Sequence, residues 1–498
     1  MAALKKREVA GSFIFKFPDG DASRRPKVAL FKRSGAVSTY QHKYAPIAGG
    51  VEASDASPLA TAWREIGEET GLTPSSLRLF RQGKPYSFGD PSVEREWTIN
   101  PFAFILDAEP AAEARITLDW EHEGFAWFDP ADVEDDTFPG VPRLRESLRR
   151  VWFELDLGHD AGTLLGRGLR ALQQDHESGA RLLADKALGL FVDVLPRLEA
   201  TPTKDAWWRT VRTVAWHIWK NGRESMGAPI LNALLAALAV IERKLPAGQV
   251  LPGGFVDTLL PSVKDLVQQG REASTCIATS FATFLRTQVS AGADRPIRML
   301  TLSSSGTVTA SLGHALASAE SPLHIRILES RPLFEGTQTA RHLAPALSPS
   351  SSKISLYADA AAGVAARNAH VVLLGADLID GAGNVSNKVG SLPAVLAARH
   401  VSPAVKVAVL AEKAKILPVE RPVHEEENDA AELTRSWDGT VAADVHGEAV
   451  DVRNVYFEWV PAALIDCYIT EDGIMTRQHM EAAAADAKRR ADRFFADL

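Results

Sequence analysis

Residues 58–72 read PLATAWREIGEETGL, a stretch that places three glutamates within five positions. Ser57 and Pro58 form a helix entry signal, because a hydroxyl caps the first turn and proline suits the first helical position. Gly71 forms an exit signal, since glycine tolerates the left-handed conformation. Between these signals the apolar residues recur at i, i+3, i+4 and i+7, namely Leu59, Ala62, Trp63 and Ile66. The spacing predicts a helix whose apolar stripe packs on a core.

The acidic residues of this helix lie to one side of the apolar stripe. Glu65, Glu68 and Glu69 fall within an arc of about 100° at helical geometry. Like charges at this spacing repel each other, and the helix dipole disfavours anions near the C-terminus. One alternative is a solvated acidic face. The other is a hard divalent cation, Mg²⁺ (or Mn²⁺), because such ions prefer carboxylate oxygens.

The stretch from Gly50 to Leu72 resembles the Nudix box, G-x5-E-x7-R-E-U-x-E-E-x-G-U, in which U is aliphatic. Eight positions stand in register: Gly50, Arg64, Glu65, Ile66, Glu68, Glu69, Gly71 and Leu72. One position departs from the pattern, because Ala56 replaces the first glutamate and Asp55 precedes it. Around the box, GSFIFKF, KVALFKR, EWTINPFAFIL and GFAWFDP are typical of strands. This order fits the α/β/α sandwich of that family over residues 1–150.

The resemblance implies a hydrolase that cleaves a nucleoside diphosphate linked to another moiety. Glu65, Glu68 and Glu69 would hold the metal ion, the Gly50 carbonyl would be a further ligand, and Arg64 would orient the glutamates. A carboxylate must also take the proton of the attacking water. The stretch DWEHEG offers two candidates, of which we favour Glu121 over Glu123 for its distance from Trp127. The alternative is that this stretch is simply a polar loop.

The whole chain sets broad limits on function. At 498 residues it is too long for one ordinary domain, and 46% hydrophobic with 24% charged residues is typical of a soluble globular protein. A net charge of −8 gives no reason to expect non-specific nucleic-acid binding. We find no apolar run of about 18 residues and no secretory signal, so we expect a cytoplasmic protein with no membrane segment. Cys276 and Cys467 have no metal or disulfide spacing, and we interpret both as packed small hydrophobes.

The remaining sequence divides into two parts. Residues 165–290 have apolar positions at helical spacing and predict a helical bundle, with its four tryptophans in the core or at an interface: Trp207, Trp208, Trp216 and Trp219. Over residues 295–498, short β-rich runs alternate with alanine-rich helical stretches, which predicts a Rossmann-like parallel sheet covered by helices. Ligands bind at the carboxyl ends of such strands. Residues 418–450 include EEEND and are interpreted as a solvated acidic excursion.

From about residue 205 onward, four ordered motifs resemble one family: NGRESMGAPILNAL, ESRPLFEG, GADLIDGAGNVSNKVGS and NVYFEWVPAALIDCYITEDG. This family contains the regulatory subunits of translation initiation factor 2B, methylthioribose-1-phosphate isomerase and ribose-1,5-bisphosphate isomerase. The resemblance implies that Asp377 matches the catalytic aspartate of the isomerases and that Asn387 and Lys388 match a substrate-binding pair. Arg331 would match a phosphate or sugar contact. Ser303 stands where the isomerases carry a catalytic cysteine.

The replacement at Ser303 affects the chemistry that this region can perform. A serine hydroxyl is far too weak an acid or base near pH 7 to act as a thiol does, whose pKa is about 8.5, so this sequence departs from the isomerases at a residue that moves protons. Ser304, Ser305 and Gly306 still offer donors at a helix N-terminus, and Lys388 adds a positive charge, so the region could bind an anion.

Three interpretations of the carboxyl-terminal region therefore stay open. It could bind a phosphosugar or nucleotide, it could be a non-catalytic assembly module with an empty scaffold, or it could be an isomerase that uses other groups. Members of the family pair through this region, which leads us to expect a homodimer or a larger oligomer.

Overall fold

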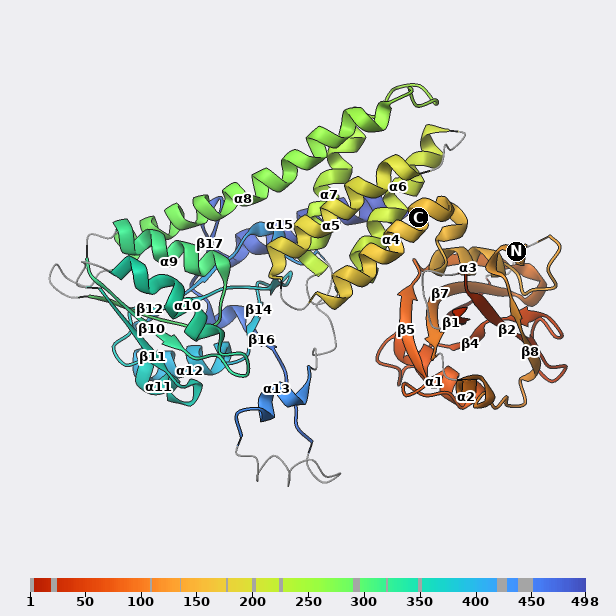
Figure 1. Ribbon diagram of the computed structural model, residues 1–498, viewed down its shortest axis with the longest axis horizontal. Coiled ribbons are helices and arrows are strands. Elements are labelled where there is room, and N and C mark those ends of the chain that lie inside the picture. The colour runs from red at the N-terminus through yellow and green to blue at the C-terminus, as the bar shows by residue number, and fades with distance from the viewer. Residues whose placement is uncertain are drawn as a thin grey trace.

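The computed structural model describes residues 4–18, 25–107, 110–134, 136–175, 178–198, 203–223, 227–289, 296–318, 321–347, 352–418, 428–437 and 451–498. A mixed sheet with flanking helices forms one end of the molecule, a parallel-sheet domain forms the other, and a helical bundle lies between them (Figure 1). The predicted fold class, an α/β/α sandwich followed by a helical bundle and a Rossmann-like domain, is confirmed.

The N-terminal sheet is built around two long strands. β1 (Lys5–Lys16) and β7 (Arg95–Leu106) pair in parallel at its centre, and the other pairings are antiparallel. The order is β3-β2-β1-β7-β5, with β4 paired to β1, β6 to β7 and β8 to β2. The remaining strands are β2 (Lys27–Arg33), β3 (Tyr44–Ala45), β4 (Ile47–Gly50), β5 (Leu77–Gln82), β6 (Tyr86–Asp90) and β8 (His122–Phe128).

Helices cover both faces of this sheet. Along β1 successive side chains point to opposite faces, so Ile14 joins one core and Phe13 and Phe15 join the other. The first core is closed by α1 (Pro58–Thr70) and the second by α3 (Leu144–Val151). A short helix, α2 (Pro110–Ala114), precedes β8. The two cores on opposite faces make this part an α/β/α sandwich.

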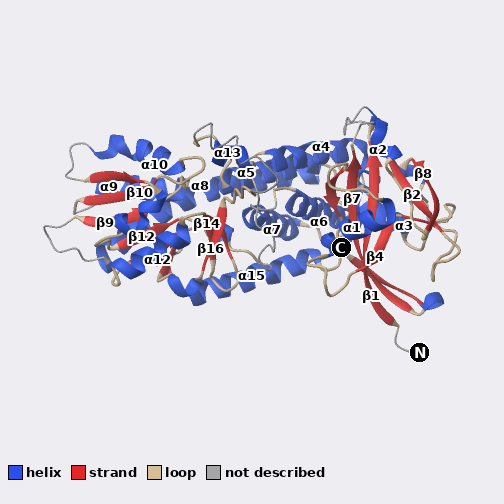
Figure 2. Ribbon diagram, turned by 90° about the horizontal axis from the view of Figure 1, so that it is seen from below, coloured by secondary structure: helices blue, strands red, loops and turns tan. Residues whose placement is uncertain are grey.

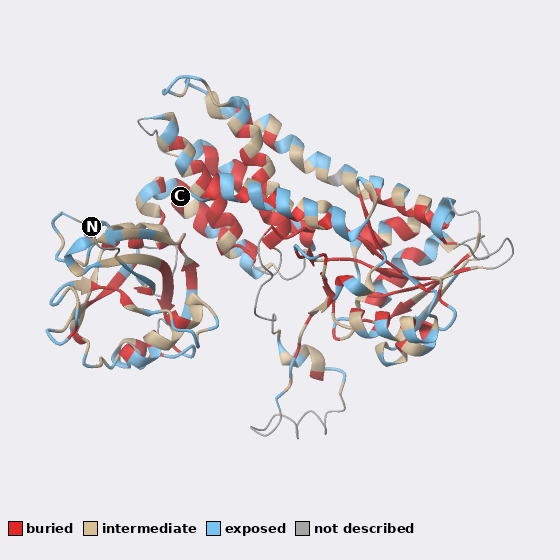
Figure 3. Cartoon of the chain, turned by 180° about the vertical axis from the view of Figure 1, so that it is seen from behind, coloured by how far each residue is buried: buried red, intermediate tan, exposed pale blue. Residues whose placement is uncertain are grey.

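The helical bundle begins at residue 154, somewhat before the predicted start at residue 165. Its helices are α4 (Glu154–Gln174), α5 (Ala180–Val194), α6 (Lys204–Asn221), α7 (Gly227–Lys244) and α8 (Phe255–Gln288). Buried residues gather where these helices face one another (Figure 3). Three of the four tryptophans are buried in this core and Trp208 packs against it, so that prediction is confirmed.

Two helices join the bundle to the parallel-sheet domain. α8 has 34 residues and is therefore about 50 Å long; Leu259 lies in the bundle core and Phe281 in the sheet core. The last helix, α15 (Arg477–Phe495), runs back from the sheet domain to the bundle (Figure 2). Its Phe494 and Phe495 side chains are buried in the bundle core. The sequence-based boundaries place this helix with residues 295–498, whereas its C-terminal half packs in the bundle.

The parallel sheet has the order β11-β10-β9-β12-β15-β17-β18, in which only the pairing of β17 with β18 is antiparallel among the described strands. The strands are β9 (Ile297–Thr301), β10 (Leu323–Leu328), β11 (Lys353–Tyr357), β12 (Val371–Leu374), β15 (Lys406–Leu410), β17 (Cys467–Thr470) and β18 (Gly473–Met475). The helices of this domain are α9 (Gly306–Ser318), α10 (Glu335–Leu343), α11 (Ala362–Ala365), α12 (Ser391–Val401) and α13 (Ala430–Thr434). A second, small sheet consists of β13 (Leu378–Ile379), β14 (Val385–Lys388) and β16 (Phe457–Val460). The strand order reverses between β9 and β12, which makes their carboxyl ends the topological switch point.

Three further expectations concern membrane segments, the two cysteines and the acidic excursion. Within the described segments, no helix has the length and apolar character needed to cross a bilayer. Cys467 is buried as expected, but Cys276 is exposed on α8, because it lies on the side of the helix that faces away from the sheet core. The interpretation of Cys276 as a packed hydrophobe is therefore wrong. Most of the acidic excursion, residues 419–427 and 438–450, lies outside the described residues.

Candidate active sites

The acidic helix α1 is fixed by the signals at its two ends. The Ser57 hydroxyl accepts a hydrogen bond from the Ala60 N–H at 3.2 Å, and Gly71 has the left-handed φ of 68°. Ala62 and Ile66 are fully buried in the core of the sandwich. Because these buried residues fix the orientation of the helix about its own axis, they also fix the direction in which the glutamate side chains point.

The three glutamates of the box differ in exposure. The side chain of Glu65 is 14% exposed and that of Glu69 is 4% exposed, whereas Glu68 is 60% exposed. Glu65 lies directly against β4, since a Cβ atom at Gly49 would overlap its carboxylate. Glu65 and Glu69 therefore lie inward toward the sheet, and Glu68 lies at the solvent edge.

Arg64 links the box to the preceding loop. Its guanidinium donates to Asp55 from Nε at 3.2 Å and from Nη2 at 3.0 Å, and to the Gly50 carbonyl at 3.2 Å. It also contacts Glu65 Oε1 at 2.7 Å and Glu68 Oε2 at 3.1 Å. The hydrogen bonds from Arg64 hold the pKa of Asp55 well below its usual range. Asp55, one position before the departure at Ala56, thus supplies a carboxylate partner for Arg64.

The loop before β8 is attached to the end of the same helix. The Asp119 N–H donates to the Glu69 carbonyl at 3.3 Å, and His122 Nε2 lies 2.5 Å from Glu69 Oε2. The His122 side chain is 1% exposed, and its Nδ1 has no hydrogen-bond partner among the described residues. Sequence reasoning missed His122, although it stands between the two candidate bases in DWEHEG.

Electrostatics in this site push the buried groups toward their neutral forms. Burial, and then the charges of Glu65, Glu121 and Asp119, raise the pKa of Glu69. Burial likewise raises the pKa of Glu65 and lowers the pKa of His122. Burial and like charge together make two adjacent carboxylates unfavourable unless a positive charge joins them.

The two candidate bases lie in different surroundings. Glu123 is bound by Lys32 on β2 at 2.9 Å and by His42, which lies between β2 and β3. Glu121 lies close enough to Glu69 for its charge to raise the pKa of that carboxyl. The charge of Glu121 therefore acts on the buried carboxylate of Glu69, whereas the carboxylate of Glu123 is engaged by Lys32 and His42.

The donor set suits a hard divalent cation. Within the described part of the chain, no group of three His, Cys, Asp or Glu side chains is arranged as a metal cluster, and Arg64 lies between Glu65 and Glu68. Glu65 and Glu69 nevertheless provide neighbouring carboxylates, and a cation would offset the burial and the Glu65 charge that raise the pKa of Glu69. The Gly50 carbonyl and Glu68 offer further oxygens, the ligand type that Mg²⁺ prefers.

A second site lies at the switch point of the parallel sheet. Ser303 follows β9 with a left-handed φ of 70°. Its N–H donates to Ser330 Oγ at 2.7 Å, and its carbonyl accepts from Thr339 Oγ1 at 2.8 Å. Ser305 Oγ accepts from the Val308 N–H at 3.4 Å in the first turn of α9. The SSSG turn is thus a structured N-terminus of a 13-residue helix.

This turn opens into a cavity of about 830 Å³. Residues from the bundle and from the sheet domain line it together, including Arg181 on α5 and Ser274 on α8. It brings together most of the residues that the sequence assigned to this site: Ser303, Ser304, Ser305, Gly306, Asp377, Asn387 and Lys388. The cavity therefore gathers the carboxyl ends of β9 and β12 and the strand β14.

Charged groups in the cavity are arranged in opposite pairs. The Lys388 ammonium is 3.1 Å from Glu335 Oε2 and 4.4 Å above the Tyr456 ring. Arg181 pairs with Glu412, and the Lys415 ammonium donates to the Ala376 carbonyl. Burial raises the pKa of Glu335, Lys388 opposes this shift, and Asp377 adds to it.

Arg331 lies elsewhere. Its N–H donates to Asp359 Oδ2 at 2.8 Å, its Nη2 donates to the Leu433 carbonyl at 2.8 Å, and its guanidinium lies over the Phe334 ring. It is not among the residues that line the cavity within the described part of the chain. The structure does not bring it to the other site residues, and its substrate contact stays a prediction.

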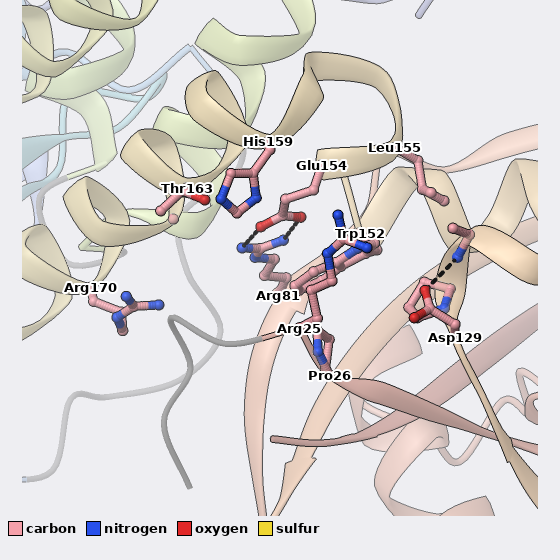
Figure 4. Close-up of a pocket in the computed structure, with 13 residues that line it drawn as sticks. Arg25, Pro26, Arg81, Asp129, Trp152, Glu154, Leu155, His159, Thr163 and Arg170 are labelled. Carbon is pink, nitrogen blue, oxygen red and sulfur yellow. Dashed lines mark hydrogen bonds and ion pairs between the residues drawn. The ribbon is translucent and has the colours of Figure 1, made fainter. Parts of the chain in front are cut away.

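A smaller cavity of about 200 Å³ lies between the sandwich and the bundle (Figure 4). Arg81 on β5 meets Glu154 on α4 there in a double ion pair, with both N–O distances 2.7 Å. The Arg81 guanidinium also lies over the Phe153 ring at 3.7 Å. Nearby, the Asn221 side chain exchanges two hydrogen bonds with the Gln82 backbone. These contacts fasten the two parts to each other.

Comparison with known protein families assigns both ends of the chain. The family model of the NUDIX domain matches residues 14–151, and that of the Initiation factor 2 subunit family matches residues 252–477. The chain joins a NUDIX domain to an initiation factor 2 subunit family domain. The resemblance to the Nudix family and the resemblance to the initiation factor 2B family are thereby confirmed, and three of the four later motifs lie within residues 252–477.

Relatives of the second domain include isomerases. The chain is 33% identical over 178 residues to methylthioribose-1-phosphate isomerase of Syntrophotalea carbinolica, which covers 35% of this chain and 50% of the relative. The same enzyme of Magnetococcus marinus is 32% identical, over 41% of this chain and 54% of the relative. The chain thus spans about half the length of these curated relatives. Among solved structures, the translation initiation factor eIF-2B of Pyrococcus horikoshii has 22% identity and a TM-score of 0.45, and covers 62% of this chain and 96% of its own.

Proposed function

We propose that the NUDIX domain is a Mg²⁺-dependent (or Mn²⁺-dependent) pyrophosphohydrolase that cleaves a nucleoside diphosphate linked to another moiety. The NUDIX domain match supports a hydrolase. The observation that carries the finer proposal is the crowding of two inward carboxylates, Glu65 and Glu69, in which burial and the charge of Glu65 raise the pKa of Glu69. A site built this way favours a divalent cation, and a cation suits a diphosphate substrate.

Each residue has a role in this proposal. Glu65, Glu69, the Gly50 carbonyl and the more exposed Glu68 would hold the ion. When bound, the ion would neutralise diphosphate charge and lower the pKa of the attacking water. Glu121 would take the proton of that water, because its charge reaches Glu69 while Glu123 is held by Lys32. Arg64, oriented by Asp55, would keep the glutamates in place.

The test is hydrolysis by the purified chain with Mg²⁺ and a panel of nucleotide sugars, dinucleotides and capped nucleotides. ADP-ribose belongs in the panel, because its cleavage yields a phosphorylated ribose that could serve the second cavity. Release of a monophosphate is expected, and the double variant Glu68→Gln and Glu69→Gln should abolish it. Glu123→Gln serves as the matched control and should retain turnover. Unchanged turnover in the double variant would remove the metal assignment.

For the carboxyl-terminal domain we propose binding of a phosphosugar or nucleotide. The support is the 830 Å³ cavity, in which the N-terminus of α9 and the Lys388 ammonium offer donors and positive charge to a phosphate. Calorimetry with ribose and methylthioribose phosphates tests this, with Asp377→Asn and Lys388→Ala as variants.

A non-catalytic assembly module is the second candidate for this domain, favoured by Ser303 at the position of the isomerase cysteine. Failure of every phosphosugar to bind would support it. In either case we propose a homodimer or larger oligomer, and a monomer by light scattering at micromolar concentration would contradict that.

A further inference from the structure

The small cavity between the sandwich and the bundle has no role in either proposed function (Figure 4). Its sandwich wall is formed by Arg25 and Pro26 before β2, by Arg81 on β5 and by the turn that follows β8. Its bundle wall is formed by α4. Among the described residues, it shares no lining side chain with the larger cavity at the switch point. It is therefore a separate cavity, built jointly by two parts of the chain.

The face of α4 that lines this cavity is polar. Gly158 has a non-helical φ of 75° and ψ of 169°, so the main run of the helix begins at the next residue. From there, four lining residues follow at i, i+4, i+7 and i+11 and so share one side of the helix: His159, Thr163, Gly166 and Arg170. A helix face that packs on a neighbouring layer is ordinarily apolar. The side chains on this face therefore favour a polar occupant over apolar packing.

Glycines on α4 let the Arg81–Glu154 ion pair approach the helix closely. A Cβ atom at Gly166 would lie 3.0 Å from Arg81 Nη2, and one at Gly162 would lie 2.6 Å from Glu154 Cγ. The ion pair thus occupies the space that two side chains of α4 would otherwise fill, and a cavity of about 200 Å³ lies beside it. Pockets for drug-sized molecules begin at about 300 Å³, so the occupant of this cavity is a small one.

The lining carries more positive than negative charge. Its described residues include two carboxylates and three arginines: Arg25, Arg81 and Arg170. Both oxygens of Glu154 accept hydrogen bonds from Arg81. One oxygen of Asp129 accepts the Ala131 N–H at 3.1 Å, and the other is 3.7 Å from the Lys27 ammonium. The charges of both carboxylates are thus offset within the protein, and the cavity as a whole is positive.

We propose that this cavity binds a phosphate-class oxyanion that bridges the sandwich and the bundle. Arg25 would hold the anion from the sandwich and Arg170 from α4, while the Thr163 hydroxyl adds a further donor. Guanidinium groups suit phosphate, because their planar fork donates two parallel hydrogen bonds to its oxygens. A tetrahedral anion presents oxygens in several directions, so two walls can hold it at once. The bound anion adds a tie across the junction that Arg81 and Glu154 already fasten.

The test is calorimetry of the full chain with inorganic phosphate and with ethyl phosphate, in EDTA and at constant chloride concentration. EDTA keeps metal ions from recruiting phosphate to the NUDIX domain, and the chain carries Lys388→Ala to weaken binding in the larger cavity. We expect one anion per chain in this background. Tighter binding of inorganic phosphate would identify the free anion as the ligand, and tighter binding of ethyl phosphate would identify a phosphomonoester.

Two variants remove the proposed contacts. Arg25→Gln, at an exposed position, should raise the dissociation constant at least about tenfold, because one charge-assisted hydrogen-bonding group is lost. Arg170→Gln on the opposite wall should have an effect of the same size. Thermal unfolding in chloride alone reports whether each variant is folded. If Arg170→Gln does not fold, Arg25→Gln decides the question alone.

Arg167→Gln is the matched control. Arg167 is exposed on the same helix and is not among the described residues of the lining. Its loss removes the same charge and should leave the dissociation constant within about twofold, since salt screens charges that do not touch the anion. An equal loss of affinity in Arg167→Gln and Arg25→Gln would show only general attraction of anions and would overturn the proposal. Unchanged affinity in Arg25→Gln, or no binding of either anion, would also overturn it.

Discussion

The two candidate sites of this chain treat charge in opposite ways. In the NUDIX domain, Glu65 and Glu69 are turned inward next to each other, and burial and like charge disfavour their ionised forms. In the carboxyl-terminal cavity, the buried carboxylates have cations of the protein beside them, Lys388 for Glu335 and Arg181 for Glu412. In the first site Arg64 pairs with Glu65, whereas Glu69 faces His122, whose charged form burial disfavours. In the second site Lys388 and Arg181 supply the positive charge.

This difference indicates what each site can take up. A crowded carboxylate pair is stabilised by a small, hard cation, which then recruits phosphate oxygens. A cavity with built-in ammonium and guanidinium groups can receive a phosphate directly. The two sites would therefore both handle phosphorylated molecules, but only the first would need a metal ion to do so.

The sharpest test of this contrast is removal of the metal ion. With excess EDTA, hydrolysis of the best panel substrate should fall at least about 1,000-fold, equivalent to about 4 kcal/mol of activation free energy. Phosphosugar binding measured by calorimetry in the same solution should not change. Recovery of hydrolysis on adding Mg²⁺ is the control. Hydrolysis that persists in EDTA would contradict the contrast, because neither site would then need a metal ion.

A second test addresses the junction that holds the two sites in one unit. Glu154→Gln leaves the Arg81 guanidinium, which is 3% exposed, without its carboxylate partner. Breaking a buried ion pair on one side should lower the free energy of unfolding of the sandwich by about 3 kcal/mol. Denaturant titration followed by tryptophan fluorescence measures this, since Trp152 lies beside the pair (Figure 4). Glu481→Gln, which removes an exposed pair with Arg477, should change stability by less than about 0.5 kcal/mol. Equal effects of the two variants would contradict a fastening role for Arg81.

The third test weakens the built-in positive charge of the cavity. Lys388→Ala should reduce phosphosugar affinity at least about tenfold, or about 1.4 kcal/mol, because it removes a buried ammonium from the cavity that the α9 turn also lines. Lys413→Ala, which breaks an exposed pair with Asp472, should leave the affinity unchanged. If both variants bind as the unaltered chain does, phosphate recognition does not depend on the charge of this cavity.

The smallest expected effect separates helix stability from carboxylate chemistry. Ser57→Ala removes the cap of α1 and should cost about 1 kcal/mol of stability. Hydrolysis should stay within about twofold, because the glutamates lie at the other end of the helix. Thr203→Ala, which removes the equivalent cap of α6, is the matched control and should affect stability alone. A large loss of turnover in Ser57→Ala would mean that the position of the glutamates depends on the cap.

Local patterns were sufficient for much of the fold. The cap at Ser57, the exit at Gly71 and the apolar stripe define α1 within its own sequence, since capping and amphipathicity act over a few residues. The alternation of strands and helices after residue 295 likewise predicts a parallel sheet. The return of α15 to the bundle core was not predicted, because burial of Phe494 and Phe495 depends on partners more than 200 residues away.

The sequence by itself determined the two families, the helix that carries Glu65, Glu68 and Glu69, and the strand-end turns that carry Ser303 and Asp377. Only the tertiary structure decided which of these groups are buried and what faces them. It placed Asp55 on Arg64, His122 on Glu69 and Lys388 on Glu335, and it left Arg331 outside the cavity. The physical reason is that the type and spacing of residues can be read from the sequence alone. Desolvation and charge pairing depend instead on distances between atoms that only the fold brings together.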